Sequence, residues 1–354
     1  QIVSRHDFGS FKIENVLFEA FPGWDVNATV YLPPGPGPHP AVVCPTGSSS
    51  KKFFNYQRAG QVFARNGYIA VSFDPPGFQG EKQELNGIFD TGFTTTLAGI
   101  WSNTYIVLPA LRALDYLDTR EDVDHQSGYA MSGLSLGGTT TNYCGFMDDR
   151  IKFFAPVGCY GSMVRNSIKL RNGSSPSSFG HGFLASGLVH VDLTCLAAPK
   201  PCFIIGRAHD VIFDPESMRQ EYQRARHIYE LHGRADDIDL YIDEDAGHEF
   251  TVKMASLVVE KMNRYLLGVT RSACSLQQSD IIDIPHEQLM SYPKNRVNFF
   301  TIYRDETIRL AAGRPRQTTP ETVRKVLGLS AANPLPRQVT TLPNPAIVWY
   351  HQLE

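Results

Sequence analysis

The chain has 354 residues, of which 42% are hydrophobic and 19% charged, and its formal net charge is −3. This composition is typical of a globular protein, and the length fits one large α/β domain with additions. The charge balance offers no basic surface for nucleic acid, and no apolar run approaches the roughly 20 residues of a membrane span. We therefore expect neither nucleic acid nor a membrane as a partner.

The ends and the cysteines of the chain say little about its location. It begins at Gln1 without a signal-peptide pattern, so we expect a processed or trimmed N-terminus. A cytoplasmic and a secreted or periplasmic location both stay open. The six cysteines lack the C-x-x-C spacing of a zinc site, and their spacing does not reveal a disulfide. No constellation of metal ligands appears, so we expect no metal, and neither phosphate-binding nor dinucleotide-binding glycine motifs occur.

Apolar runs of strand length alternate with helical patterns along most of the chain. The predicted strands are 11–20, 26–32, 41–47, 68–74, 129–131, 151–157, 201–206 and 238–242. The predicted helices are 56–66, 100–118, 138–144, 214–232 and 252–267. The first two strands alternate apolar and polar residues, which is typical of a hairpin at a sheet edge. The later alternation predicts an α/β fold, with a mostly parallel central sheet and helices on both faces.

This pattern places one catalytic domain at residues 1–267 and a C-terminal extension of unknown role at 268–354. Two stretches within the domain, about 78–98 and 162–190, are polar and lack clear periodicity. We interpret them as lid-like insertions over the active face. The extension contains a short helical pattern at 320–329 and an apolar run at 346–350, and is otherwise rich in proline and polar residues.

The stretch at 128–144, GYAMSGLSLGGTTTNYC, contains the motif G-x-S-x-G at Gly133, Ser135 and Gly137. The motif lies between an apolar strand and a helix of small residues. In this context it predicts a nucleophile elbow, a strained turn that lifts the serine hydroxyl above the sheet. The alternative is a glycine-rich turn with a surface serine.

A serine nucleophile needs a base and an acid that orients the base. When these three stand on successive strand ends, the chain order is serine, acid, histidine. Asp210 follows the strand at 201–206 and His248 follows the strand at 238–242, so they are the candidate acid and base for Ser135.

Neighbouring polar residues offer alternatives to this assignment. Asp214 is the rival acid, although its place before Pro215 favours helix capping. His209 has either a structural or a substrate-facing role. Glu249, beside the base, is expected to pair with a backbone or arginine group.

The oxyanion of the reaction requires two N–H donors. One is expected from the backbone of Leu136, directly after the nucleophile, and the other from Ser48 in the loop Thr46-Gly47-Ser48. A simple polar turn is the alternative for this loop, because no H-G-G-G string is present.

Aromatic residues are frequent in the predicted loops. Four of them are candidates for substrate binding: Phe78, Trp101, Tyr160 and Phe183. They would line a pocket for a sugar or aryl ester, or else serve only in loop packing.

Several segments together resemble the acetyl-xylan-esterase-like and dienelactone-hydrolase-like branch of the α/β hydrolases. They are PTGSSS, YQRAGQVFARNGYIAVSFDPPGFQGE, RALDYLDTR, GLSLGG, DDRIKFFAPVGCYG, GLVHVDL, APKPCFIIGRAHD and GHEF, within about residues 10–267. The resemblance implies the α/β-hydrolase fold, a serine esterase with Ser135, Asp210 and His248 as triad, and no cofactor. It also implies that Thr46-Gly47 replaces the family's H-G string, and that residues 268–354 lead toward a second domain or an assembly contact.

The sequence thus predicts a serine carboxylic-ester hydrolase that acts on acetylated carbohydrate or small acyl esters. The same triad would also suit an amide, lactone or C–C bond hydrolase, and a non-catalytic assembly module with a hydrolase-like fold is the alternative from another class. The expected partner is a small-molecule or carbohydrate ester, and a homo-oligomer stays open.

Overall fold

The computed structural model describes residues 1–75, 100–101, 103–162, 187–292, 297–313, 319–326, 338–341 and 348–351. The chain divides into two compact units, Gln1–Ile308 and Arg309–Glu354. The sequence-based boundary after residue 267 thus falls inside the first unit. Apart from residues 162 and 187–190, the predicted lid-like insertions lie outside the described residues.

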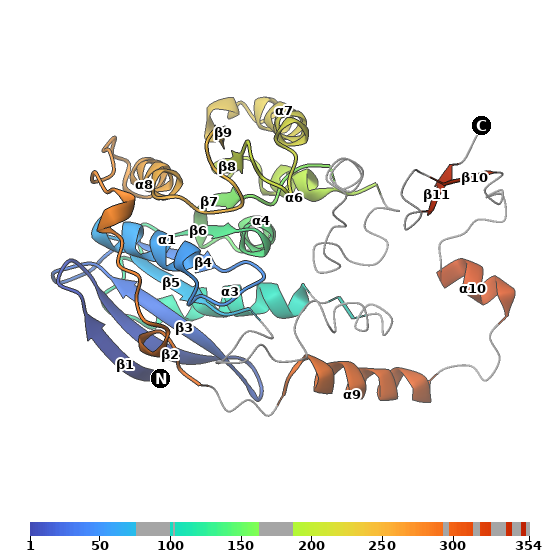
Figure 1. Cartoon of the computed structure of the whole chain (residues 1–354), viewed down its shortest axis with the longest axis horizontal. Helices are drawn as coiled ribbons and strands as arrows, with labels where there is room; N and C mark the ends of the chain where they lie inside the picture. Colours follow the sequence, from blue (N-terminus) through green and yellow to red (C-terminus); the bar gives the residue numbers. More distant parts are fainter. Residues whose placement is uncertain are drawn as a thin grey trace. The chain divides into compact units, whose positions relative to one another are not determined.

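Nine strands in the described part of the first unit form one sheet, in the order β1-β2-β3-β5-β4-β6-β7-β8-β9 (Figure 1). Their bounds are β1 Ile2–Asp7, β2 Lys12–Phe21, β3 Trp24–Leu32, β4 Ala41–Pro45, β5 Ile69–Phe73, β6 Tyr129–Leu134, β7 Ile151–Val157, β8 Cys202–Arg207 and β9 Ile238–Asp243. The first three strands join antiparallel, whereas β5, β4, β6, β7, β8 and β9 are mutually parallel. The predicted hairpin and mostly parallel sheet are confirmed, but the edge next to the hairpin is formed by β1, which pairs with β2.

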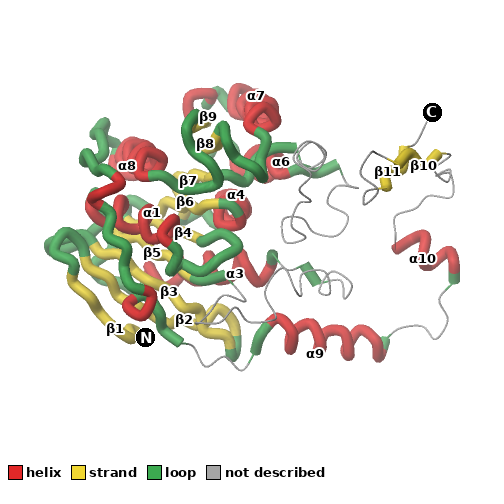
Figure 2. Tube along the Cα trace, viewed as in Figure 1, coloured by secondary structure: helices red, strands yellow, loops and turns green. Residues whose placement is uncertain are grey.

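Helices pack on both faces of the sheet, as its apolar strands require (Figure 2). One apolar cluster includes residues of α3 Thr104–Asp118, α4 Leu136–Met147, α6 His190–Ala197 and α7 Pro215–Leu231. The other includes residues of α1 Phe54–Arg65 and α8 Val252–Leu267. The expected α/β class, with helices on either side, is therefore confirmed.

A segment beyond α8 packs on the sheet unit. We call residues 281–291 the C-terminal strap. The side-chain amide of Gln57 accepts from Ile284 N at 2.8 Å and donates to Ile284 O at 3.2 Å. Gln61 pairs with Ile282 in the same manner, at 2.9 and 2.6 Å. Two glutamines of α1 thus pair with the backbone of the strap as a neighbouring strand would.

Short elements complete the described residues. They are the 3₁₀ turns η3 Ala235–Asp237, η4 Gln278–Asp280 and η5 His286–Gln288, the helices α9 Phe299–Ala312 and α10 Pro320–Val326, and the strands β10 Gln338–Thr341 and β11 Val348–His351. The last two pair antiparallel. All six cysteines are free thiols. Among the described residues, no helix has the length and apolar character to cross a membrane.

Candidate active site

The loops that carry the candidate triad leave the same end of the sheet. The strands β6, β7, β8 and β9 are adjacent and parallel. Parallel strands direct their carboxyl ends to one side, where ligands of such sheets bind. We call this side the carboxyl end of the sheet. It receives Ser135 after β6, Asp210 after β8 and His248 after β9.

Ser135 occupies a sharp turn between β6 and α4. Its φ of 62° and ψ of −120° make it the one non-glycine residue with positive φ in the described part of the chain. Its N–H donates to Val157 O at 2.8 Å, which anchors the turn to β7. A β-carbon at Gly137 would lie 2.0 Å from Pro45 O, so the close packing against β4 requires glycine there. Such backbone strain costs about 1–3 kcal/mol and is typical of nucleophile elbows.

Asp210 and His248 are in direct contact. The Nδ1 atom of His248 lies 3.1 Å from Oδ1 and 3.0 Å from Oδ2 of Asp210. Asp210 Oδ1 also accepts the backbone N–H groups of Ile212 at 2.8 Å and Phe213 at 3.2 Å. Burial alone raises the pKa of Asp210, but the hydrogen bond from His248 and the charge of Arg207 outweigh it, so the pKa falls below its usual value. The carboxylate is therefore ionised beside the imidazole at neutral pH.

The rival residues have other partners. Asp214 is the N-cap of α7, where its Oδ2 accepts the N–H of Ser217 at 3.0 Å. Glu249 pairs with Arg58 of α1 at 2.9 Å. The backbone N–H of His209 donates to Ala246 O at 3.2 Å. These contacts agree with capping for Asp214 and an arginine pair for Glu249.

The loop after β4 lies against the nucleophile. A β-carbon at Gly47 would lie 3.1 Å from Ser135 Cβ and 2.4 Å from the hydroxyl oxygen of Tyr56. Ser48 follows Gly47, and Leu136 is the first residue of α4, where backbone N–H groups have no acceptor within the helix. The two predicted oxyanion donors thus come from segments that meet at Ser135.

A buried polar network holds the end of this loop. Asp74, at the carboxyl end of β5, accepts from Lys51 N at 2.7 Å, Ser50 Oγ at 2.8 Å and Asn27 Nδ2 at 2.9 Å. Lys51 Nζ donates to Thr29 Oγ1 at 2.8 Å and to the carbonyl of Leu289 in the C-terminal strap. Burial lowers the pKa of Lys51 to about 8, and burial raises that of Asp74.

The four predicted substrate-binding aromatics have different outcomes. Phe78 and Phe183 lie outside the described residues. Trp101 is half-buried and packs edge-on against Tyr143, with ring centroids 5.1 Å apart. Tyr160 is fully buried, and its hydroxyl donates to Asn142 Oδ1 at 3.2 Å. The surroundings of Tyr160 are those of a core side chain and give its predicted role no support.

The sequence reasoning missed three buried charges near this end of the sheet: Lys51, Asp74 and Arg207. Asp74 and Arg207 stand at the ends of apolar runs, and Lys51 follows the candidate oxyanion loop. These positions were the available signal in the sequence that the three charges lie near the site. Among the described residues, no group of three or more His, Cys, Asp or Glu side chains is arranged to hold a metal ion.

No family model and no curated protein matches this sequence. Among solved structures, the chain is similar to a methylesterase, with a TM-score of 0.67 and 21% identity over 88% of this chain and 69% of that one. It is also similar to an acetyl xylan esterase from Paenibacillus sp. R4, with a TM-score of 0.56 and 18% identity over 75% and 88% of the two chains. A third similar structure is a glucuronoyl esterase from Solibacter usitatus, with a TM-score of 0.56 and 15% identity over 74% of this chain and 85% of that one. These likenesses show that the chain has the α/β-hydrolase fold.

Proposed function

We propose that this chain is a serine carboxylic-ester hydrolase whose triad is Ser135, His248 and Asp210. The observation that carries the proposal is the Asp210–His248 contact at 3.0 Å, at the same end of the sheet as the strained Ser135 turn. The similarity in fold to three esterases supports the choice of an ester over other acyl compounds.

In the proposed mechanism, Ser135 Oγ attacks the ester carbonyl while His248 Nε2 takes its proton. Asp210 holds the imidazole through Nδ1 and stabilises the imidazolium that forms. The backbone N–H groups of Leu136 and Ser48 stabilise the tetrahedral oxyanion. His248 then protonates the leaving alcohol, and water, activated by the same imidazole, releases the acid from the acyl-serine.

The favoured substrate is an acetylated carbohydrate or another small acyl ester. The named neighbours include an acetyl xylan esterase, which supports an acetyl group, as well as a methylesterase and a glucuronoyl esterase, whose names indicate esters of other composition. Acetate released from acetylated xylan and methanol released from a methyl-esterified carbohydrate separate acetyl esters from methyl esters. The proposal expects acetate release to be the faster of the two.

The first test is turnover of p-nitrophenyl acetate by the wild type, Ser135→Ala and His248→Gln. We expect the wild type alone to be active. Ser127→Ala is the matched control, because Ser127 lies in the loop before β6 and bonds to Asp124. Equal rates for the wild type and Ser135→Ala would refute the proposal.

A further inference from the structure

Arg207, the last residue of β8, lies beneath the candidate acid and base. Its side chain is fully buried. A β-carbon at Gly158 would lie 2.1 Å from both Nη1 and Nη2 of Arg207, and Gly158 has a φ of +55°. Only glycine at the end of β7 therefore leaves room for the guanidinium. The fold reserves a closed space for this charge.

One nitrogen of Arg207 contacts both members of the pair. Nη2 donates to Asp210 Oδ2 and lies 2.8 Å from Nδ1 of His248. The Nε and Nη1 atoms of Arg207 have no hydrogen-bond partner in the part of the chain that the structure describes. Unpaired donors of a buried charge are unfavourable for folding. A purely structural arginine would be expected to use these donors, so its placement needs another explanation.

The contact at Nδ1 has a chemical consequence. A neutral imidazole carries its proton on one nitrogen and accepts with the other. With the proton on Nδ1, His248 donates to Asp210 and its Nε2 is free to take a proton from serine. With the proton on Nε2, Nδ1 accepts from Arg207 and the base cannot act. Asp210 and Arg207 thus favour opposite tautomers of the same ring.

We propose that Arg207 is a positioning residue that shares the Asp210 carboxylate with His248 and disfavours the protonated imidazole. This inference rests on the proposed function of the same site. When His248 takes the serine proton, two cations face one carboxylate, so Arg207 promotes transfer of that proton to the leaving group. Removing the charge of Arg207 leaves a base that holds its proton to higher pH.

Other ionisable groups surround the pair but do not replace this charge. Glu249, next to His248, and Cys159, after β7, interact electrostatically with Arg207. Glu249 is neutralised by Arg58 of α1. Burial raises the pKa of both Cys159 and Tyr56, so both are neutral at pH 7. Arg207 is therefore the cation that directly contacts the pair.

The kinetic test compares the wild type with Arg207→Met, Arg207→Gln and Arg207→Lys, using p-nitrophenyl acetate and kcat/KM from pH 5 to 9. For both neutral variants we expect the acidic limb of the kcat/KM profile to move by about one unit to higher pH, which lowers kcat/KM by up to about tenfold at pH values below the limb. For Arg207→Lys, we expect the acidic limb of the kcat/KM profile to lie at the same pH as in the wild type. A lower profile of unchanged shape in both neutral variants would overturn the proposal, because a merely structural role lowers activity without moving the limb.

A second readout does not depend on turnover. The ¹⁵N chemical shifts of the His248 ring report its tautomer, with His248→Gln for assignment and Ser135→Ala as background. We expect the neutral Arg207 variants to shift the ring toward the Nδ1-protonated form. Identical tautomer populations in wild type and both variants would overturn the proposal. A wild type without Ser135-dependent turnover would refute the esterase proposal instead, and the ring spectra would still test Arg207.

Discussion

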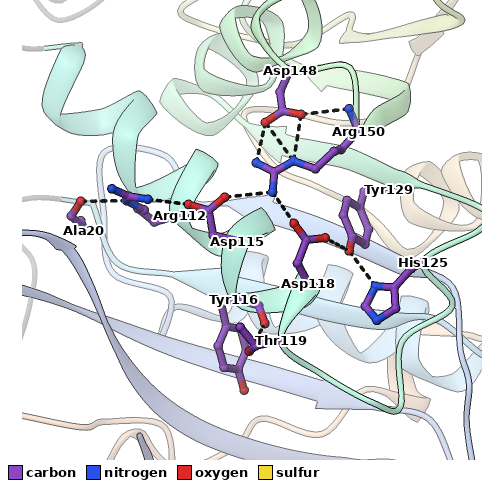
Figure 3. Close-up of polar contacts among 10 residues, drawn as sticks. All are labelled: Ala20, Arg112, Asp115, Tyr116, Asp118, Thr119, His125, Tyr129, Asp148 and Arg150. Atoms are coloured by element: carbon purple, nitrogen blue, oxygen red, sulfur yellow. Dashed lines mark hydrogen bonds and ion pairs between the residues drawn. The ribbon is translucent and has the colours of Figure 1, made fainter.

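Two arginines at opposite ends of the central sheet show how differently a charge can be placed in one fold. Arg150, at the amino ends of the parallel strands, pairs with Asp115 at 2.9 Å and Asp148 at 2.7 Å, and also with Asp118 (Figure 3). Its side chain is 34% exposed. Arg207, at the carboxyl end, is fully buried and bonds through one nitrogen.

The two ends of the sheet differ in how completely their polar groups are paired and in whether the backbone is strained. Around Arg150, Tyr129 donates to Asp118 and His125 lies 3.1 Å from the Tyr129 hydroxyl, so the carboxylates of this network each have polar partners (Figure 3). At the carboxyl end, the Ser135 backbone is strained and two nitrogens of Arg207 lack partners among the described residues. Strain and unpaired polar groups are expected at functional sites, where they must serve the chemistry.

The substitution Asp210→Asn is expected to show the largest difference in activity between the carboxyl and amino ends of the sheet. The change keeps the shape of the acid but favours the wrong imidazole tautomer, so we expect kcat to fall about 10⁴-fold. Asp118→Asn is the matched change at the amino end, and its kcat should stay within about threefold of wild type, since surface substitutions rarely reach a distant site. Rates of p-nitrophenyl acetate hydrolysis check both. Comparable losses in the two variants would remove the distinction between the ends.

Lys51→Met tests whether buried charges at the carboxyl end also hold the fold. It removes the buried ammonium that bonds to Thr29 and Leu289 and acts electrostatically on the buried carboxylate of Asp74. Removing one of two interacting buried charges typically costs about 3–5 kcal/mol of unfolding free energy. Urea unfolding measures the loss. Lys52→Met is the neighbouring control, expected within about 0.5 kcal/mol of wild type. The double variant with Asp74→Asn should recover part of the loss, and no recovery would argue against coupling between the two side chains.

Gly47→Ala tests the packing of the candidate oxyanion loop against the nucleophile. The added methyl would meet the Tyr56 hydroxyl at 2.4 Å and must displace the loop. A displaced donor lowers kcat about 10²-fold. Removing the hydroxyl by Tyr56→Phe in the same chain should restore part of the rate. Gly247→Ala is the control, because a β-carbon there has no atom closer than 3.9 Å.

Arg150→Met should have the smallest effect. Partly exposed ion pairs contribute little, so we expect a loss of about 1 kcal/mol in unfolding free energy at pH 7 and an unchanged kcat. Calorimetry and turnover together check this. A large fall in kcat would contradict the assignment of the amino end to stability.

The same variant has an expected pH dependence. Hydrogen bonds with Arg150 lower the pKa of Asp148 below 3.8. Burial alone would raise the pKa of Asp115, but hydrogen bonds with Arg112 and Arg150 outweigh burial, so this pKa is lowered as well. Carboxylates with depressed pKa values stabilise the fold above about pH 4, and this contribution is lost as the pH falls through their folded-state values. The stability difference between wild type and Arg150→Met should therefore shrink below pH 4. A difference that grows there would contradict the network.

Local patterns predicted the sheet and the positions of the candidate triad. The apolar runs before Ser135, Asp210 and His248 predict buried strands. When such strands are parallel, the loops that follow them meet at one end of the sheet. The strand β1 and the helix α6 were missed because each is short and lacks a clear period. The helix α9 was missed too, in a stretch interpreted as proline-rich and polar. Lys51 and Arg207 appear in the sequence as ordinary polar residues. Their burial depends on partners far along the chain, such as Leu289 and Gly158, which no local pattern reveals.

The proposed function depends on Ser135 as the nucleophile and on His248 as the base that activates it. Covalent labelling with a fluorophosphonate probe, followed by intact mass and peptide mapping, tests both roles. We expect one adduct on Ser135 in the wild type, none in Ser135→Ala and much slower labelling of His248→Gln. A wild type that stays unlabelled, or an adduct that persists in Ser135→Ala, would contradict this assignment.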